Sequence, residues 1–168
     1  MFQVVENTGL VAMPTNSKRF RKKGLRSDIA AEADGCYLSA MQNILLIAVF
    51  GATGAIARYA TSGWAQRLCG DGFPYGTLIV NVLGCFLLGI VQHLATQSTA
   101  FPELWRNALA IGFLGAFTTF STFGYETVKH LEAGNWSVAL GSISANLALG
   151  FAAVWAGLAL ARLLTSSP

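Results

Sequence analysis

Residues Gly112-Phe-Leu-Gly-Ala-Phe-Thr-Thr-Phe-Ser-Thr-Phe123 form an apolar stretch with four hydroxyl side chains in five consecutive positions. Ser and Thr side chains bond to nearby backbone groups and compete with regular helix, and Gly112 and Gly115 add conformational freedom. Irregular backbone is tolerated at membrane depth only where it lines protein or a cavity. We therefore predict a transmembrane helix that is broken here, near the membrane midplane.

The composition around this stretch is that of a membrane protein. The 168 residues are 54% hydrophobic and 11% charged, whereas a soluble domain carries about 25% charged residues. Ten charges lie in residues 1–40 and only nine in residues 41–168. The second segment can cover its apolar side chains only if lipid is its solvent. Its five basic and four acidic residues give little support to a nucleic-acid partner.

Four stretches are long enough to cross a hydrocarbon core, which takes about 20 apolar residues per helix. The first runs from Asn43 to Trp64 and the second from Tyr75 to Ala95; the third lies between Arg106 and Glu126. The fourth begins at Trp136 within residues 133–161. We predict an all-α membrane protein with four transmembrane helices in residues 41–168.

Residues 1–40 form a separate basic segment that lacks the hydrophobic region of a signal peptide. We expect this tail to be disordered. The cluster Lys18-Arg19-Phe20-Arg21-Lys22-Lys23 is either a solvated basic run or a site for anionic lipid headgroups. A third interpretation is an over-extended reading frame, with Met41 as the natural initiator.

The balance of cations depends on this tail. Within residues 41–168, Arg106 and Arg162 fall on one side of a four-helix subunit, and Arg67, Lys129 and nearby Arg58 on the other. Lys and Arg in short loops set orientation, so this near balance permits insertion in both directions. The six cations of the tail would remove the balance.

Polar side chains within the spans are few, and each is a functional candidate because such groups are costly in lipid. The sequence lacks the paired carboxylates, Ser-His-Asp set and metal-ligand spacing that catalysis would need, so we do not expect an enzyme. By periodicity alone, the phenylalanines of the third span are a packing stripe. Arg58 is either an anion site or a side chain that snorkels to the interface or bonds to helix-terminal carbonyls. The candidates are Arg58, Thr77, Asn81, Thr118, Thr119, Ser121, Thr122, Glu126, Ser142, Ser144 and Asn146.

Three segments, residues 51–59, 76–89 and 112–123, closely resemble the Fluc/CrcB fluoride channel family in order and spacing over about residues 41–164. The resemblance implies passive export of fluoride through an antiparallel, dual-topology homodimer in the bacterial plasma (inner) membrane. It also implies two pores and a structural sodium ion at the dimer centre. Such pores offer fluoride neutral donors and the positive edges of phenyl rings.

The family's functional residues match positions of this sequence. The resemblance implies a pore at Asn81, Phe120 and Phe123, sodium-binding carbonyls at Gly115 and Thr118, and a structural arginine at Arg58. In the fourth span the family usually has a Tyr followed four residues later by a Ser, and Ser142 and Asn146 take those places here. The remaining residues of the predicted fluoride pathway are Thr77, Ser121, Thr122 and Glu126.

Two other classes compete with the channel interpretation. A small multidrug-type, proton-coupled exporter also has four helices, but it needs a carboxylate deep in a span; the first span has Arg58 instead, and Glu126 lies at an end. A non-transporting assembly subunit would explain the many glycines, which allow close helix packing. It would leave the hydroxyl and phenylalanine cluster unexplained.

Overall fold

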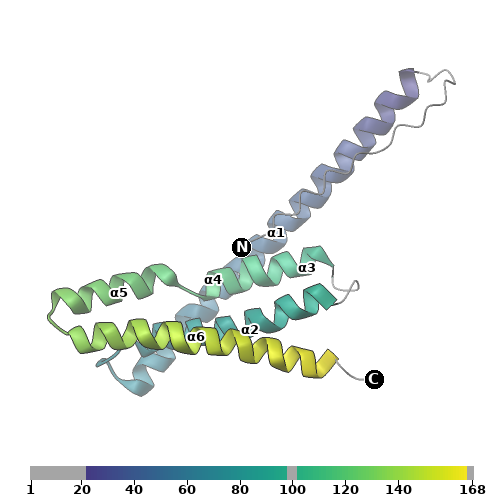
Figure 1. Ribbon diagram of the computed structural model, residues 1–168. Coiled ribbons are helices and arrows are strands. Elements are labelled where there is room, and N and C mark those ends of the chain that lie inside the picture. Colours follow the sequence, from purple (N-terminus) through teal and green to yellow (C-terminus); the bar gives the residue numbers. More distant parts are fainter. Residues whose placement is uncertain (1–21, 98–101, 166–168) are drawn as a thin grey trace. The chain divides into compact units, whose positions relative to one another are not determined.

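A computed structural model describes residues 22–97 and 102–165, and every regular element in those ranges is a helix (Figure 1). Residues 1–38 and 39–168 form two units. All the packing described below lies within the second unit.

Four helical stretches are long and apolar enough to cross a membrane: Tyr37–Cys69, Tyr75–Gln97, Glu103–Glu132 and Trp136–Thr165. They confirm the four predicted spans and the all-α fold class. The connections contain the expected turn formers; Gly70 and Gly134 have positive φ angles of 85° and 75°, a conformation that glycine adopts without steric cost.

The first span is part of helix α1 (Lys22–Cys69). Residues 22–40 are therefore helical where the sequence led us to expect disorder. Ala30, Ala31 and Ala33 lie in this segment, and alanine has the highest intrinsic helix propensity. The expectation for residues 1–21, including most of the basic cluster, lies outside the described residues.

The third span consists of four short elements. Helix α3 (Glu103–Asn107) leads into a π-helix, η1 (Ala108–Leu114), followed by α4 (Gly115–Phe117) and α5 (Phe120–Glu132). The π-helical turn was not predicted. Such turns are rare and occur often at functional sites.

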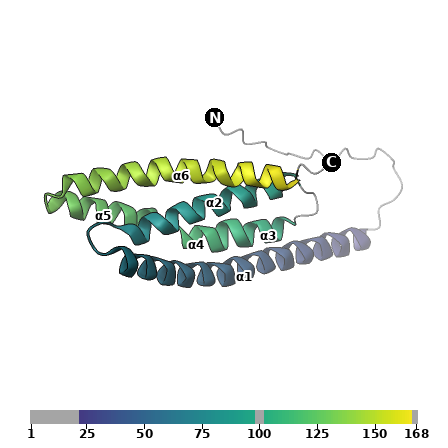
Figure 2. The same ribbon diagram turned by 90° about the horizontal axis from the view of Figure 1, so that it is seen from below.

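Helix α2 (Tyr75–Gln97) occupies the centre of the packing in residues 39–168. It lies between α6 (Trp136–Thr165) and the α3–α4 part of the third span (Figure 2). Glycines make these approaches close: a methyl group at Gly157 would overlap the Phe86 carbonyl, and one at Gly84 would overlap the Thr118 side chain. Glycine thereby brings α2 against the end of α4, as expected where membrane helices pack closely.

Large apolar side chains cover the outside of the second unit. Tyr59, Phe120, Phe151 and Trp155 are between 72% and 85% exposed. Most of the buried apolar residues are small, including Ala108, Ala139 and Ala153. An exposed apolar surface of this kind needs lipid or another protein surface as its environment.

Candidate functional site

Two extended residues separate helices α4 and α5. Helix α4 ends at Phe117; Thr118 has φ −79° and ψ 157°, and Thr119 has φ −146° and ψ 110°. The Thr119 hydroxyl then accepts a hydrogen bond from the Thr122 backbone N–H (3.2 Å), which caps the start of α5. Threonine suits this position because its oxygen replaces the carbonyl that a preceding turn would supply.

Asn81 of helix α2 bonds to both backbone groups of Thr119. Its Oδ1 accepts from the Thr119 N–H (2.9 Å), and its Nδ2 donates to the Thr119 carbonyl (3.2 Å). Leaving a buried donor or acceptor unpaired costs about 1–3 kcal/mol. The Asn81 oxygen therefore supplies the acceptor that the Gly115 carbonyl would offer the Thr119 N–H in a continuous helix.

Two carbonyl groups lose their regular helical partners at the same place. In a continuous α-helix, the Thr119 N–H would bond to the Gly115 carbonyl, and the Thr122 N–H to the Thr118 carbonyl. Here the first N–H bonds to Asn81 and the second to the Thr119 hydroxyl. Backbone carbonyls released in this way are ligands that ion-binding filters use.

Arg58 of helix α1 lies beside these groups. Its Nη1 is 3.5 Å from the Thr118 carbonyl oxygen, to which it donates. Arg58 and Thr77 also line a cavity of about 350 Å³ that is rich in hydroxyl groups. Its full lining is Ala55, Arg58, Tyr59, Ser62, Gly63, Thr77, Thr119 and Thr122.

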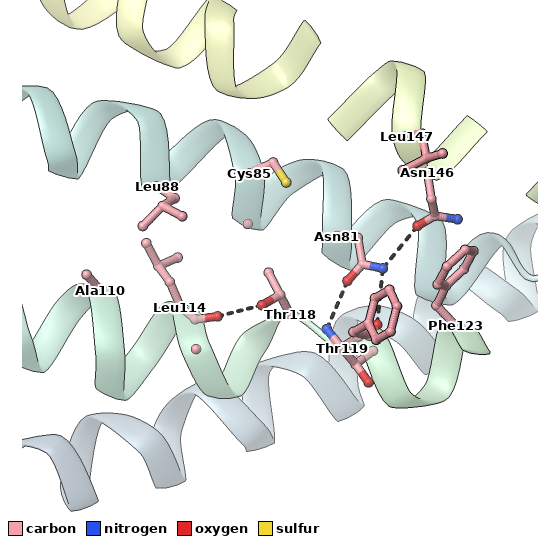
Figure 3. Close-up of a pocket in the computed structure, with 13 residues that line it drawn as sticks. Asn81, Cys85, Leu88, Ala110, Leu114, Thr118, Thr119, Phe123, Asn146 and Leu147 are labelled. Atoms are coloured by element: carbon pink, nitrogen blue, oxygen red, sulfur yellow. Dashed lines mark hydrogen bonds between the residues drawn. The ribbon is translucent and has the colours of Figure 1, made fainter. Parts of the chain in front are cut away.

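A separate pocket of about 300 Å³, here called the amide pocket, lies on the side of Asn81 and Asn146 (Figure 3). The rings of Phe120 and Phe123 belong to its wall, with their centroids 5.7 Å apart and their planes inclined at 55°. The edge of a phenyl ring is electropositive. The pocket is lined by Asn81, Gly84, Cys85, Leu88, Ala110, Leu114, Gly115, Thr118, Thr119, Phe120, Phe123, Asn146 and Leu147.

Asn146 of helix α6 joins the amide of Asn81. Its Oδ1 accepts from Asn81 Nδ2 (3.0 Å), and its Nδ2 donates to the Ser142 carbonyl (2.9 Å). Ser142 itself is 1% exposed, and its hydroxyl has no hydrogen-bond partner among the described residues. The two fourth-span candidates therefore differ, because Asn146 lines the amide pocket and Ser142 lies in the packing.

The structure divides the other predicted site residues among three places. Phe120, Phe123, Asn81, Gly115 and Thr118 meet at the amide pocket. The cavity beside Arg58 contains Thr77 and Thr122, and the third place, described next, contains Glu126. The exposed Ser121 lines none of these three cavities.

The third place, here called the charged cavity, has a volume of about 410 Å³ and lies where the α1–α2 connection meets the end of α5. One Glu126 carboxylate oxygen is buried there without a hydrogen-bond partner among the described residues. The described residues contain no group of three or more His, Cys, Asp and Glu side chains that could hold a metal ion. The cavity is lined by Gln66, Asp71, Phe73, Pro74, Glu126, Lys129, His130, Ala133 and Asn135.

Sequence reasoning listed Thr119 among the polar candidates without a role of its own, and it did not predict Cys85 at the amide pocket. Thr119 is the hydrogen-bonding centre between α4 and α5, and its place in the hydroxyl cluster is the signal that pointed to it. Cys85 of helix α2 also lines the pocket. Its position one helical turn after Asn81 places it on the same face.

These features define a class: a multi-pass, all-helical membrane protein with a polar site at an interruption in its third span. A family model described as "CrcB-like protein, Camphor Resistance (CrcB)" matches residues 45–158. The chain is 46% identical over 122 residues to the fluoride-specific ion channel FluC of Geobacter metallireducens, which covers 73% of this chain and 98% of that protein. Coverage is the same for the FluC of Geobacter sulfurreducens, which is 49% identical.

The chain belongs to the CrcB/FluC family. The family is one of ion channels, so the protein is not an enzyme. The recognition of the Fluc/CrcB family from the three sequence segments is confirmed.

Proposed function

We propose that this protein is a fluoride-selective channel that passively exports fluoride from the cytoplasm of a bacterium. The observation that carries the proposal is the amide pocket, where two asparagine side chains and two phenyl rings meet at the interruption between α4 and α5. The FluC name of its relatives supports the same ion. Passive conduction is expected because the sequence has no phosphate-binding motif of the G-x-x-x-x-G-K type.

The chemistry of the pocket suits a small, strongly hydrated anion. A pore must replace the water around fluoride with other donors, and amide N–H groups, hydroxyls and the edges of phenyl rings are neutral groups that do so. A buried Lys or Arg would bind an anion too firmly for rapid release, since conduction requires weak, multi-site binding. The proposed pathway is Asn81, Phe120, Phe123, Ser121, Thr122, Thr77, Glu126, Ser142 and Asn146.

The functional unit that we propose is an antiparallel homodimer with two pores, in the bacterial inner membrane. Phe120 is 83% exposed in the single chain although it carries a proposed pore ring. A second copy would cover it and close the pore wall. The nearly balanced cations of residues 41–168 are those that insertion in both orientations requires.

Sodium at the dimer centre is part of the same proposal. The carbonyls of Gly115 and Thr118, which lack their regular helical partners, fit a hard cation because such ions take oxygen ligands. Two copies would present four such oxygens around one ion. When bound, sodium supplies positive charge near the fluoride path without a buried basic side chain.

The break of the third helix near the membrane midplane completes the proposal. Asn81 stabilises the extended residues Thr118 and Thr119 through the Thr119 backbone. Arg58, which donates to the Thr118 carbonyl, is a structural residue in this scheme.

Fluoride efflux from liposomes containing the purified full-length protein tests the proposal. The liposomes are loaded with fluoride or with chloride, and external ion concentrations are followed with selective electrodes. We expect fluoride release well above that of protein-free liposomes and chloride release at the background rate. Retention of fluoride, or equal release of chloride, would overturn the proposed function.

A further inference from the structure

The outward face of helix α6 carries a groove near the end of the helix. The groove has a volume of about 330 Å³ and shares no residue with the three cavities described above. Helix α6 packs on α2 through small buried residues such as Ala153, Gly157 and Ala161, so the groove lies on its other face. It is lined by Trp155, Leu158, Ala159, Arg162 and Leu163.

Two tryptophans place this groove at the membrane interface. Trp136 and Trp155 are 63% and 72% exposed, and Trp155 follows Trp136 by 19 positions along α6. At 1.5 Å per residue this spacing is about 28 Å, close to the thickness of a hydrocarbon core, about 30 Å. Tryptophan is enriched at both membrane–water interfaces. Arg162 lies about 10 Å beyond Trp155, and therefore at the level of the lipid headgroups.

The guanidinium of Arg162 has no ion pair and no hydrogen bond among the described residues. Arg162 is exposed, and it is the only charged side chain of α6. Other arginines are engaged: Arg106 lies 3.4 Å from the Glu103 carboxylate, and Arg67 donates to the Gly63 carbonyl (3.0 Å). Arg162 therefore offers its positive charge to a group outside this part of the chain.

A hydrogen bond to α2 fixes the end of α6 that carries the groove. The Thr165 hydroxyl donates to the Ala161 carbonyl (3.0 Å). A hydroxyl has only one hydrogen, so Thr165 accepts from Nε2 of His93 (3.0 Å), a residue of α2 that is 8% exposed. The last turn of α6 is thus held in place before any ligand binds, which lowers the entropic cost of binding.

We infer that this groove binds one anionic phospholipid, with the phosphate on Arg162 and an acyl chain along Leu158 and Ala159 beside Trp155. Arginine suits the headgroup because its planar guanidinium donates two parallel N–H bonds to a phosphate. A negative net charge is favoured because α6 has no acidic side chain that competes for Arg162. The apolar lining suits a lipid chain. The inference is independent of the ion that the channel conducts.

Substitutions at the cation separate lipid recognition from the stability of the helix end. Arg162→Gln removes the charge and keeps a polar side chain, whereas Arg162→Lys keeps the charge. Arg67→Gln is the matched control, because Arg67 is also an exposed arginine in the last turn of a long helix. It accounts for the loss of a positive charge that favours a helix C-terminus.

The measurement is quenching of tryptophan fluorescence in vesicles of equal parts phosphatidylglycerol and phosphatidylcholine. Bromine is placed near the headgroup end of the acyl chain, in one preparation on the phosphatidylglycerol and in the other on the phosphatidylcholine. Each full-length protein is prepared with and without Trp155→Phe, so that the difference in fluorescence reports Trp155 alone.

One cation at a membrane surface favours an anionic lipid about fivefold, and we expect this preference at Trp155 of the wild type. Arg162→Gln should abolish the preference, whereas Arg162→Lys and Arg67→Gln should retain it. Because Arg162 is exposed, we expect all variants to keep the wild-type size-exclusion profile.

Three results would overturn the inference. The first is equal quenching of wild-type Trp155 by the two brominated lipids. The second is a preference for brominated phosphatidylglycerol that Arg162→Gln leaves unchanged. The third is a Trp155 that neither lipid quenches, which would show that a second copy or another protein surface covers the groove.

Discussion

The amide pocket and the charged cavity both place polar groups in an apolar helical bundle, but the first uses neutral groups and the second uses charged ones. At the amide pocket the hydrogen bonds of Asn81 all run between neutral groups and join it to Thr119 and Asn146. The charged cavity brings together Asp71, Glu126, Lys129 and His130. A neutral network holds a geometry without binding an anion tightly, whereas charged groups near water attract ions from a distance.

This contrast predicts that substitutions at the amide pocket have large effects on fluoride flux and that removal of the exposed charge of Lys129 at the charged cavity has a small one. It also predicts that only the effect of the substitution at the charged cavity depends on the salt concentration. Each experiment below tests one part of the contrast.

The largest expected effect is that of Phe120→Ile. The change keeps an apolar side chain but removes the electropositive ring edge, so we expect fluoride efflux to fall about 100-fold or more while the protein still forms the proposed dimer. Phe151→Ile, at another highly exposed phenylalanine, is the control and should conduct normally. Unchanged efflux in Phe120→Ile would show that the phenylalanines have only a packing role.

Asn81→Ala should have the second largest effect. The substitution removes three hydrogen bonds and leaves both backbone groups of Thr119 without their side-chain partner. We expect the free energy of unfolding to fall by about 2–4 kcal/mol and efflux to fall about 30-fold, measured by thermal unfolding and by liposome assay. Gln92→Ala, exposed on the same helix, should change neither, and a fully stable Asn81→Ala would contradict the bridging role.

Thr119→Val has a smaller expected effect because it removes only the hydroxyl contacts with Thr122, including the cap of α5, and keeps both backbone bonds to Asn81. Loss of an N-cap costs about 1 kcal/mol, and we expect a comparable drop in stability with an approximately fivefold loss of efflux. Thr119→Ser keeps the oxygen that accepts from the Thr122 N–H and should restore both quantities. Failure of serine to rescue would show that the methyl group, and not the cap, matters.

The smallest effect is expected at the charged cavity. Lys129 is exposed, so its charge is screened by solvent, and Lys129→Gln should slow efflux by no more than about threefold at low ionic strength. The difference from the wild type should shrink when an impermeant salt is added. A large, salt-independent loss would place the main ion site at this cavity instead.

Much of the fold was predictable because lipid imposes simple rules. Apolar stretches of sufficient length with at most one charge predicted all four spans, and the second helix begins at Tyr75 as expected. The helical start of α1 at Lys22 was not predicted. Disorder was inferred there from charge and the lack of a long apolar run, which outweighed the good helix propensity of the alanines in the same segment.

The site was predictable as a set of residue types but not as a set of bonds. The hydroxyl cluster pointed to residues 118–122, yet only the structure shows that Thr119, rather than its neighbours, makes two backbone hydrogen bonds with Asn81, accepting one and donating the other. The contact of Asn81 with Asn146 joins residues 65 positions apart. Local patterns contain no signal for such a pair, and none for the π-helical turn at Ala108–Leu114.

The most direct test of passive, fluoride-selective conduction is the reversal potential of the current through a planar bilayer containing the wild-type protein. With a fluoride gradient and separate, opposing chloride and proton gradients, the account predicts reversal at the Nernst potential of fluoride. It also predicts that changes in the other two gradients leave this potential unchanged. A reversal potential that follows the proton or chloride gradient would contradict the account.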